Sequence, residues 1–400
     1  MISGELTQLI DVRRQIGVGT FRTSPRMREL VNQVLDSGRI SYGPMSRAFE
    51  AQFAEIHGCA YGVLSNSGTS SLHVALQTLK EMHGWQDGDE VIVPALTFVA
   101  TVNVVLHNGM VPVLVDVEPR LYGIDPYQIE RAITPRTRAI MPVHLFGQPC
   151  DIAMVQAIAD HHKLKIIEDS CETMFAQHHN KTVGAWGDIG CFSMYVAHLL
   201  TTGVGGIATT NDPEIAAVMR SLVNHGRDGI YIAIDDDRGL QGAELREIIS
   251  RRFNFERIGH SFRITELEAA LGLAQLETWG DMIYQRNQNA KSLTYGLREY
   301  QDRLQLPSMR PQTTHSWMMY PIVLRQERKT RLTAHLEEHG IETRDMLPLV
   351  SQPAYRGLWN PDDYPVARWI DECGFYVGCH QDLTHGDLAY MVDVIREGLK

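Results

Sequence analysis

Hydroxyl and ionisable side chains directly follow apolar, strand-length runs of this 400-residue chain. After one run, Ser67, Gly68 and Thr69 form a turn that opens a helical pattern, so hydroxyls and free backbone N–H groups meet at a helix start, as in phosphate-binding sites. Another run ends in Asp169, whose carboxylate could bind a metal, orient a base or hold a protonated ring nitrogen. The alternative for each is structural, because serine, threonine and aspartate also cap helices.

A histidine completes this ordered set of polar residues. The next apolar run ends near Ser193, and His198 follows five residues later, in the turn before the sequence TTGVGG. An imidazole titrates close to neutral pH, so it can act as a general acid or base. The alternative for His198 is a degenerate site in which the side chain has no catalytic role.

Seven apolar runs of strand length must position these residues. Most are followed by a helix-period segment, with Gly, Pro, Asp or Ser between the two. This alternation indicates an α/β fold with a mainly parallel sheet covered by helices, and ligands of such sheets bind at the carboxyl ends of the strands. The runs are 61–66, 90–96, 111–117, 138–146, 164–170, 189–195 and 205–212.

Two domains are expected, a large α/β domain over residues 1–256 and a smaller α+β domain over 257–400. Within the first, the polar segment 223–256 is expected to be a surface insertion. Residues 264–300 are expected to form a long amphipathic helix or a bent pair that leads into the second domain. The second domain is expected to contain a strand and two helices, at 318–325, 330–340 and 388–399.

Composition excludes several classes of protein. The formal net charge is −11, and no run of five Lys and Arg residues occurs, so nucleic acid is not an expected partner. The chain has no 18-residue apolar segment, and its start, MISGELTQLIDVRR, lacks the basic and then apolar order of a signal peptide; we expect no membrane association and a cytoplasmic location. The six cysteines are scattered without a CxxC pair, so neither disulfides nor a metal site are predicted.

The chain resembles the DegT/DnrJ/EryC1/StrS sugar aminotransferases, a family of fold-type I pyridoxal phosphate (PLP) enzymes. Matching segments extend over nearly the whole length and include YGPMSRAFEAQFAEIHG, SNSGTSSLHVAL, MPVHLFGQPCD, IIEDSCETMFA, IGHSFRITELEAALGLAQLE and GIETR. The resemblance implies an enzyme with the fold-type I architecture, in which a large domain has a mainly parallel seven-stranded sheet and a smaller α+β domain follows. It also implies a homodimer with sites at the subunit boundary.

The resemblance implies which residues hold the cofactor phosphate. Gly68 and Thr69, with Ser67 beside them, would cradle it, and Ser193 would add a hydroxyl. The family's GYN segment, whose asparagine usually reaches the phosphate across the dimer interface, has the sequence GHS here. Ser261 or the histidine before it must therefore replace that contact, or the contact is lost.

The same resemblance implies how the cofactor ring is held. Phe98 would stack on the ring, although it could equally be a core residue, and Asp169 would keep the ring nitrogen protonated so that the ring accepts electrons. Glu172 stands near the ring hydroxyl, where the family commonly has glutamine, and adds a negative charge beside a phenolate. Val204 replaces the acid of the family's TTGEGG loop.

The most consequential departure is His198, which replaces the lysine that bonds covalently to the cofactor aldehyde and later moves protons. An imidazole can do only the second, so PLP or pyridoxamine phosphate (PMP) is expected to be bound noncovalently. The same exchange marks a branch of the family, the 3-dehydratases of nucleotide-linked 4-keto-6-deoxysugars. There the amine of PMP condenses with the sugar ketone, the histidine removes a proton, the C3 hydroxyl leaves, and glutamate restores the amine.

Three functions remain open at this point. The resemblance favours C3 dehydration of a nucleotide-activated sugar, of the type without an iron–sulfur cluster, because the cysteines are too far apart for one. A sugar aminotransferase is the alternative, making an amino sugar for polysaccharides such as the lipopolysaccharide O-antigen or for secondary metabolites. The third possibility is a non-catalytic, cofactor-binding or regulatory homologue.

Overall fold

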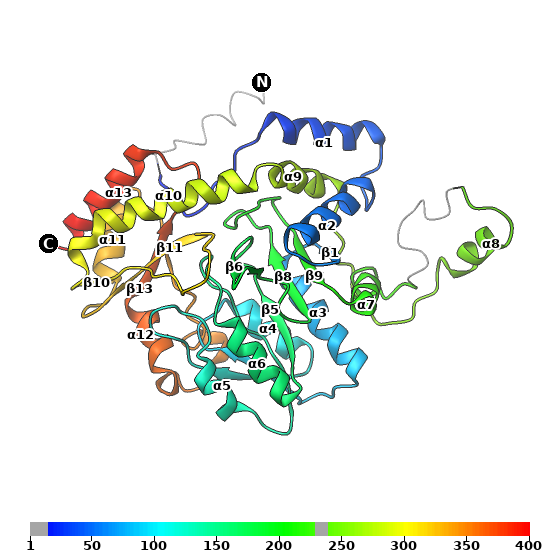
Figure 1. Ribbon diagram of the computed structural model, residues 1–400, viewed down its shortest axis with the longest axis horizontal. Coiled ribbons are helices and arrows are strands. Elements are labelled where there is room, and N and C mark those ends of the chain that lie inside the picture. The colour runs from blue at the N-terminus through cyan, green and yellow to red at the C-terminus, as the bar shows by residue number, and fades with distance from the viewer. Residues whose placement is uncertain (1–14, 229–238) are drawn as a thin grey trace.

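The computed structural model describes residues 15–228 and 239–400, and Figure 1 shows their arrangement. All seven apolar runs form strands of one sheet, in the order β1-β9-β8-β5-β4-β2-β3. This confirms the predicted seven-stranded α/β fold. The strands are β1 (Tyr61–Ser65), β2 (Glu90–Pro94), β3 (Val111–Val115), β4 (Thr137–Ile140), β5 (Lys165–Asp169), β8 (Ile189–Ser193) and β9 (Gly206–Thr210).

The sheet is mostly parallel. Strands β3, β2, β4, β5 and β8 run parallel to one another, and β9 is antiparallel to both β8 and β1. Strand β4 is shorter than the predicted run 138–146, because Pro142 has no N–H to continue the ladder. The chain stays extended beyond β4, and Val143 forms an isolated bridge with Asp169.

Helices pack on both faces of this sheet. Ile92 and Ile166 lie in the core beside α5 and α6, whereas Val91 and Ile167 lie in the larger core with α3. Alternate strand residues thus point to opposite faces, and both faces are apolar. The helices that cover the sheet are α3 (Gly68–His83), α4 (Val99–His107), α5 (Pro126–Ala132), α6 (Ile152–His162) and α7 (Pro213–Val223).

Residues 264–300 form the bent pair of helices, α9 (Glu266–Leu276) and α10 (Trp279–Leu297). Helix α9 packs against α1 (Pro25–Ser37) and α2 (Pro44–Ile56), and α10 leads toward the C-terminal part of the chain (Figure 1). No helix in the described ranges is long and apolar enough to cross a membrane.

The C-terminal part contains a four-stranded antiparallel sheet in the order β10-β11-β13-β12. The predicted strand and two helices appear as β11, α11 and α13, whereas the sequence analysis does not predict β10, β12, β13 and α12. These elements are β10 (Leu304–Gln305), β11 (Met319–Leu324), α11 (Thr330–Glu338), β12 (Thr343–Asp345), α12 (Pro365–Cys373), β13 (Gly374–Gly378) and α13 (His385–Gly398).

The predicted surface insertion contains a helix, α8 (Gly242–Arg251), in which only Ile248 is buried. The stretch 229–238 of this insertion lies outside the described residues. The remaining short elements are β6 (Gln177–His178), β7 (Lys181–Thr182) and three 3-10 helices at Arg298–Tyr300, Pro353–Tyr355 and Pro361–Asp363.

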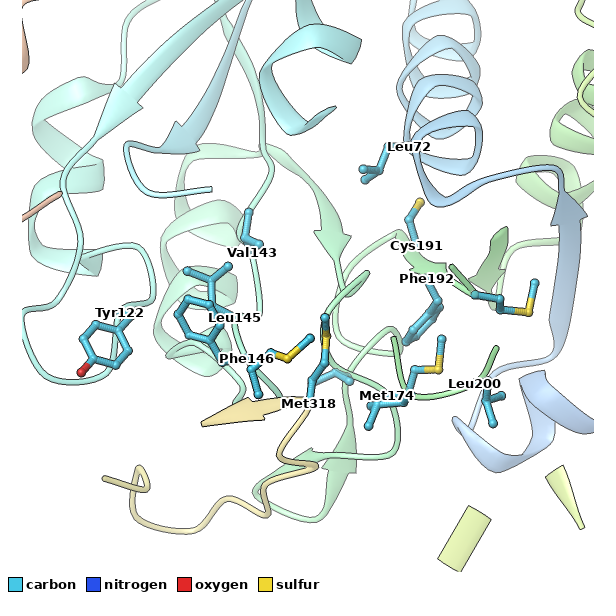
Figure 2. Packing of buried hydrophobic residues seen from close by; sticks show 14 of the residues in the cluster. Leu72, Tyr122, Val143, Leu145, Phe146, Met174, Cys191, Phe192, Leu200 and Met318 are labelled. Atoms are coloured by element: carbon cyan, nitrogen blue, oxygen red, sulfur yellow. The ribbon is translucent and has the colours of Figure 1, made fainter. Parts of the chain in front are cut away.

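One buried apolar cluster includes residues of both sheets. Figure 2 shows Met318, from the chain just before β11, near Leu145, Phe146 and Met174, which come from the segments around β4 and β5. Because these side chains share one core, the C-terminal sheet is held beside the carboxyl edge of the large sheet. The candidate functional site lies along this edge.

Candidate active site

A cavity of about 710 Å³ opens at the carboxyl ends of β5 and β8, beside the start of α3. It brings together eight of the nine site residues that the sequence predicted. These eight are Ser67, Gly68, Thr69, Phe98, Asp169, Glu172, Ser193 and His198.

The start of α3 provides the hydroxyl-lined part of the cavity. Ser67 is the N-cap, and its Oγ accepts a hydrogen bond of 3.0 Å from the N–H of Ser70. A Cβ atom on Gly68 would stand 2.6 Å from Cβ of Ser193, so only glycine lets the helix approach β8 this closely. The positive end of the helix therefore meets the hydroxyls of Thr69 and Ser193 in one place, and this donor set suits an anion.

Asp169 ends β5 and is buried in the cavity wall. Its Oδ2 accepts a hydrogen bond of 2.8 Å from the Thr101 hydroxyl, and its Oδ1 accepts one of 3.2 Å from the N–H of Cys171. Burial raises the pKa of Asp169, while these hydrogen bonds act in the opposite direction. A buried carboxylate in this position is suited to pair with a protonated nitrogen of a bound ligand.

Glu172 lies three residues beyond Asp169 in the same wall, and Oε2 accepts a hydrogen bond of 3.0 Å from the N–H of Phe146. Burial, followed by repulsion from Asp169, raises the pKa of Glu172 to about 7. The carboxyl group is therefore protonated in a large fraction of molecules at neutral pH. In that form it can donate a hydrogen bond, as a glutamine amide does.

His198 lies in the loop between β8 and β9, where its backbone N–H donates to the carbonyl of Tyr195 at 2.8 Å. The ring lines the cavity, and Nδ1 is shielded from solvent without a hydrogen-bond partner among the described residues. Burial lowers the pKa of His198 to about 4, and interaction with the Ser193 backbone partly opposes this effect. The imidazole is thus neutral near pH 7 and can accept a proton.

Phe98 and Val204 are both exposed in the described chain. Phe98 is the N-cap of α4, lines the cavity and is 57% exposed, so it is not a core residue. An exposed aromatic face beside Asp169 fits a planar ligand ring. Val204 is 53% exposed and does not line the cavity.

The remaining predicted site residue, Ser261, lies away from the cavity of its own chain. Its backbone forms an isolated bridge with Asn224, and its hydroxyl accepts a hydrogen bond of 3.0 Å from Arg263. The preceding His260 contacts Gln77 through Nε2 at 2.8 Å. A contact between Ser261 and the cofactor phosphate therefore stays a prediction about a second subunit.

The cavity residues to which the sequence assigns no role include three ionisable ones, Glu342, Arg344 and Tyr376. Among the described residues that line the cavity, Arg344 is the only Lys or Arg, and it forms an ion pair with Glu342. The other Glu342 oxygen accepts a hydrogen bond of 2.8 Å from the N–H of Val18. Two of these residues, Glu342 and Arg344, lie in the segment GIETR, which matches the family. That match is the only sign of their importance in the sequence, and the local sequence does not show that this segment lies beside the cavity.

The cavity residues together fit a phosphorylated pyridine. Hydroxyls and free N–H groups at the start of α3 suit the phosphate, Asp169 suits a protonated ring nitrogen, and the exposed face of Phe98 suits the ring. The unpartnered nitrogen of His198 is available for a proton from a bound ligand.

Comparisons with known proteins agree with this description. The sequence profile of the DegT/DnrJ/EryC1/StrS aminotransferase family matches residues 23–396. A GDP-perosamine synthase from Caulobacter vibrioides is 34% identical over 390 residues, which cover 96% of this chain and 98% of that protein. A dTDP-4-dehydro-2,6-dideoxy-D-glucose 3-dehydratase from Saccharopolyspora spinosa is 32% identical, over 90% of this chain and 81% of that protein.

Solved structures show the same fold. The E. coli GDP-4-keto-6-deoxy-D-mannose-3-dehydratase with bound hydrated PLP superposes with a TM-score of 0.84. The alignment covers 95% of this chain and 99% of that chain at 24% sequence identity, a level that supports the fold alone.

Proposed function

Because the chain belongs to the DegT/DnrJ/EryC1/StrS aminotransferase family and is thus a PLP- or PMP-dependent enzyme, we propose that it removes the C3 hydroxyl of a nucleotide-linked 4-keto-6-deoxysugar. Glutamate would supply the amine. The observation that carries this proposal is His198, a neutral, partly unpartnered imidazole in the cavity; the sequence resemblance implies that it replaces the family's lysine. The 32% identity to a sugar 3-dehydratase supports it.

The cofactor would be held by residues that already surround the cavity. Ser67, Gly68, Thr69 and Ser193 would hold the phosphate, and Phe98 would cover the ring. Asp169 would pair with the ring nitrogen. When bound, PMP supplies an amine that can condense with a ketone and a ring that accepts electrons. A contact of Ser261 with the phosphate of the partner subunit's cofactor would require a homodimer.

His198 would move the proton, and it cannot do what a lysine does. Its imidazole accepts a proton in the neutral form that burial favours. It has no primary amine, so it neither bonds to the cofactor aldehyde nor displaces the substrate from it. The cofactor therefore stays noncovalent, and the hydroxyl at C3 has time to leave.

Two further residues would complete the site. Glu172 in its protonated form would donate a hydrogen bond to the cofactor's ring hydroxyl, which removes the charge conflict that its sequence position suggests. Arg344 would hold an anionic group of the substrate, because in the described ranges it is the one Lys or Arg side chain that lines the cavity, beside three carboxyl groups. The diphosphate of a nucleotide-linked sugar matches this charge.

The proposed chain organisation has two domains. Residues 1–256 would form the large cofactor-binding domain, with the insertion 223–256, and residues 257–400 the small domain. The enzyme would work in the cytoplasm, where nucleotide sugars and glutamate are available.

Product analysis tests the proposed reaction. The chain is incubated with PMP, glutamate and either GDP-4-keto-6-deoxymannose or a dTDP-linked 4-keto sugar. Dehydration gives a sugar that lacks the C3 oxygen and keeps a ketone, with one ammonia and one 2-oxoglutarate per turnover. Detection of both small products with the deoxy ketone supports the proposal.

A sugar aminotransferase is the second candidate, and the 34% identity to a GDP-perosamine synthase favours it. The same incubation would then give an amino sugar and 2-oxoglutarate without ammonia. Cofactor binding with neither product would indicate a non-catalytic homologue.

A further inference from the structure

A second cluster of ligand-type side chains lies in the C-terminal part of the chain, outside the cavity. His335 and His339 are one helical turn apart at the end of α11, and Glu397 is in the last turn of α13. One ligand atom from each side chain lies within 4.8 Å of the other two. We propose that these three residues bind one divalent transition-metal ion of the zinc type.

Helix geometry and packing bring the three groups together. Residues four apart lie on the same face of a helix, so both imidazoles face α13, which packs against α11. The hydroxyl of Tyr390, on α13, donates a hydrogen bond of 3.0 Å to the carbonyl of His339. The ligands are therefore carried by two helix ends that are fixed relative to each other.

The hydrogen bonding of the two histidines favours metal binding. Nδ1 of His339 lies 2.7 Å from the carbonyl oxygen of His335, which can only accept, so the proton is on Nδ1 and Nε2 keeps its lone pair. Metal-binding histidines commonly use a backbone carbonyl in this way to fix the tautomer. Nε2 of His335 is shielded from solvent and has no hydrogen-bond partner among the described residues.

The three side chains converge without bonding to one another. In the described part of the chain, no hydrogen bond or ion pair joins Glu397 to either imidazole. Ligand atoms on a tetrahedral zinc ion stand about 3.4 Å apart, so a modest rotation of the exposed Glu397 and His339 would close the set. Two imidazoles and a carboxylate are a common three-ligand set for zinc, with water in the fourth position.

The ion would fasten the end of α13 to α11. None of these residues lines the catalytic cavity, so turnover is expected to be independent of the ion. The cysteine pattern predicts no metal site, because these ligands are two histidines and a glutamate, and the glutamate lies far from the histidines in the sequence.

The test uses untagged full-length protein, stripped with EDTA and then dialysed against ZnCl2. His339→Ala and Glu397→Gln remove one exposed ligand each, and His162→Ala is the matched control, since His162 also lies beside a second histidine at a helix end. We expect one zinc per chain in the wild type and in the control, and none in the two ligand variants. Hydrogen exchange of residues 385–398 should slow on zinc addition only where zinc binds.

Equal zinc retention in all four proteins would overturn the proposal and indicate adventitious binding. Absence of retained zinc from the wild type would overturn it as well. Because the ligand variants leave the cavity intact, their cofactor binding should equal that of the wild type, which also shows that they fold.

Discussion

Two sets of residues share the cavity but are built in different ways. The hydroxyl set, Ser67, Gly68, Thr69 and Ser193, depends on a helix cap and on a close approach of that helix to β8, and three of its four members are consecutive in the sequence. The ionisable set consists of Asp169, Glu172, His198 and the more distant Arg344; burial raises the pKa of the two acids and lowers the pKa of His198. The first set fixes where a cofactor is held, whereas the second decides which reaction follows.

Replacing His198 should separate the two sets most clearly. His198→Asn removes the proposed base but keeps a polar side chain, so turnover should fall by about 10²- to 10⁴-fold. PMP affinity, measured by fluorescence titration, should change little, because the hydroxyl set is untouched. If affinity falls as far as turnover, the division between the two sets is wrong.

His198→Lys sharpens the same comparison. The lysine restores a primary amine within the loop before β9, so PLP should become covalently attached, and borohydride reduction should leave its mass on the chain. The wild type should release all of its PLP under the same treatment. A wild-type chain that retains the cofactor mass would show that another lysine serves, contrary to the proposal.

Gly68→Ala changes the hydroxyl set and leaves the side chains of the ionisable set in place. The added Cβ would stand 2.6 Å from Cβ of Ser193 and 2.7 Å from Sγ of Cys171, so the start of α3 must move. We expect the free energy of unfolding to fall by about 1–3 kcal/mol. PMP affinity should weaken by at least about tenfold, because a tenfold change corresponds to only about 1.4 kcal/mol. Gly280→Ala, in α10, is the control, because nothing lies within 4 Å of its added Cβ.

The sequence predicts these two sets to different extents. Ser67 and Gly68 follow a strand and open a helix, so their role depends on neighbours along the chain and was visible as a pattern. The seven strands were visible for the same reason. Arg344 reaches the cavity only because β12 pairs with β13 and packs beside the large sheet, and the low pKa of His198 results from burial; neither is encoded in a local pattern.

Arg344→Gln should affect substrate binding rather than chemistry. Removing a hydrogen bond to a charged group costs about 1.5–3 kcal/mol, so the KM for the anionic substrate should rise by about tenfold or more while kcat changes little. Arg344→Lys should recover part of the loss, because it keeps the charge but not the two-pronged geometry. Arg368→Gln, on α12 outside the cavity, serves as the control. A fall in kcat at unchanged KM would place Arg344 in the chemical step instead.

Glu172→Gln should have the smallest effect on rate and the most distinctive dependence on pH. Burial raises the pKa of Glu172 to about 7, so the donating, protonated form prevails below pH 7 and is lost as the pH rises through 7. Wild-type affinity for PMP should therefore weaken between pH 6 and 8, after correction for titration of the cofactor itself. Glutamine donates at every pH, so the variant should show wild-type affinity at pH 6 and no such decline.

The PMP affinity of the wild type and of Glu172→Gln is measured over the same pH range. Titration of the cofactor phosphate affects both proteins equally, so a difference between the two curves reports on Glu172. Asp169 and Tyr376 face the same carboxyl group, and Asp169 is already among the causes of the raised pKa. If the PMP affinity of both proteins declines equally with pH, Glu172 does not change its protonation state between pH 6 and 8, and the proposed role of its titration is wrong. If only the wild-type affinity declines, burial keeps Glu172 protonated at low pH, and its carboxyl group then donates a hydrogen bond as an amide does. The chemistry of the ionisable set would in that case depend on burial as well as on residue type.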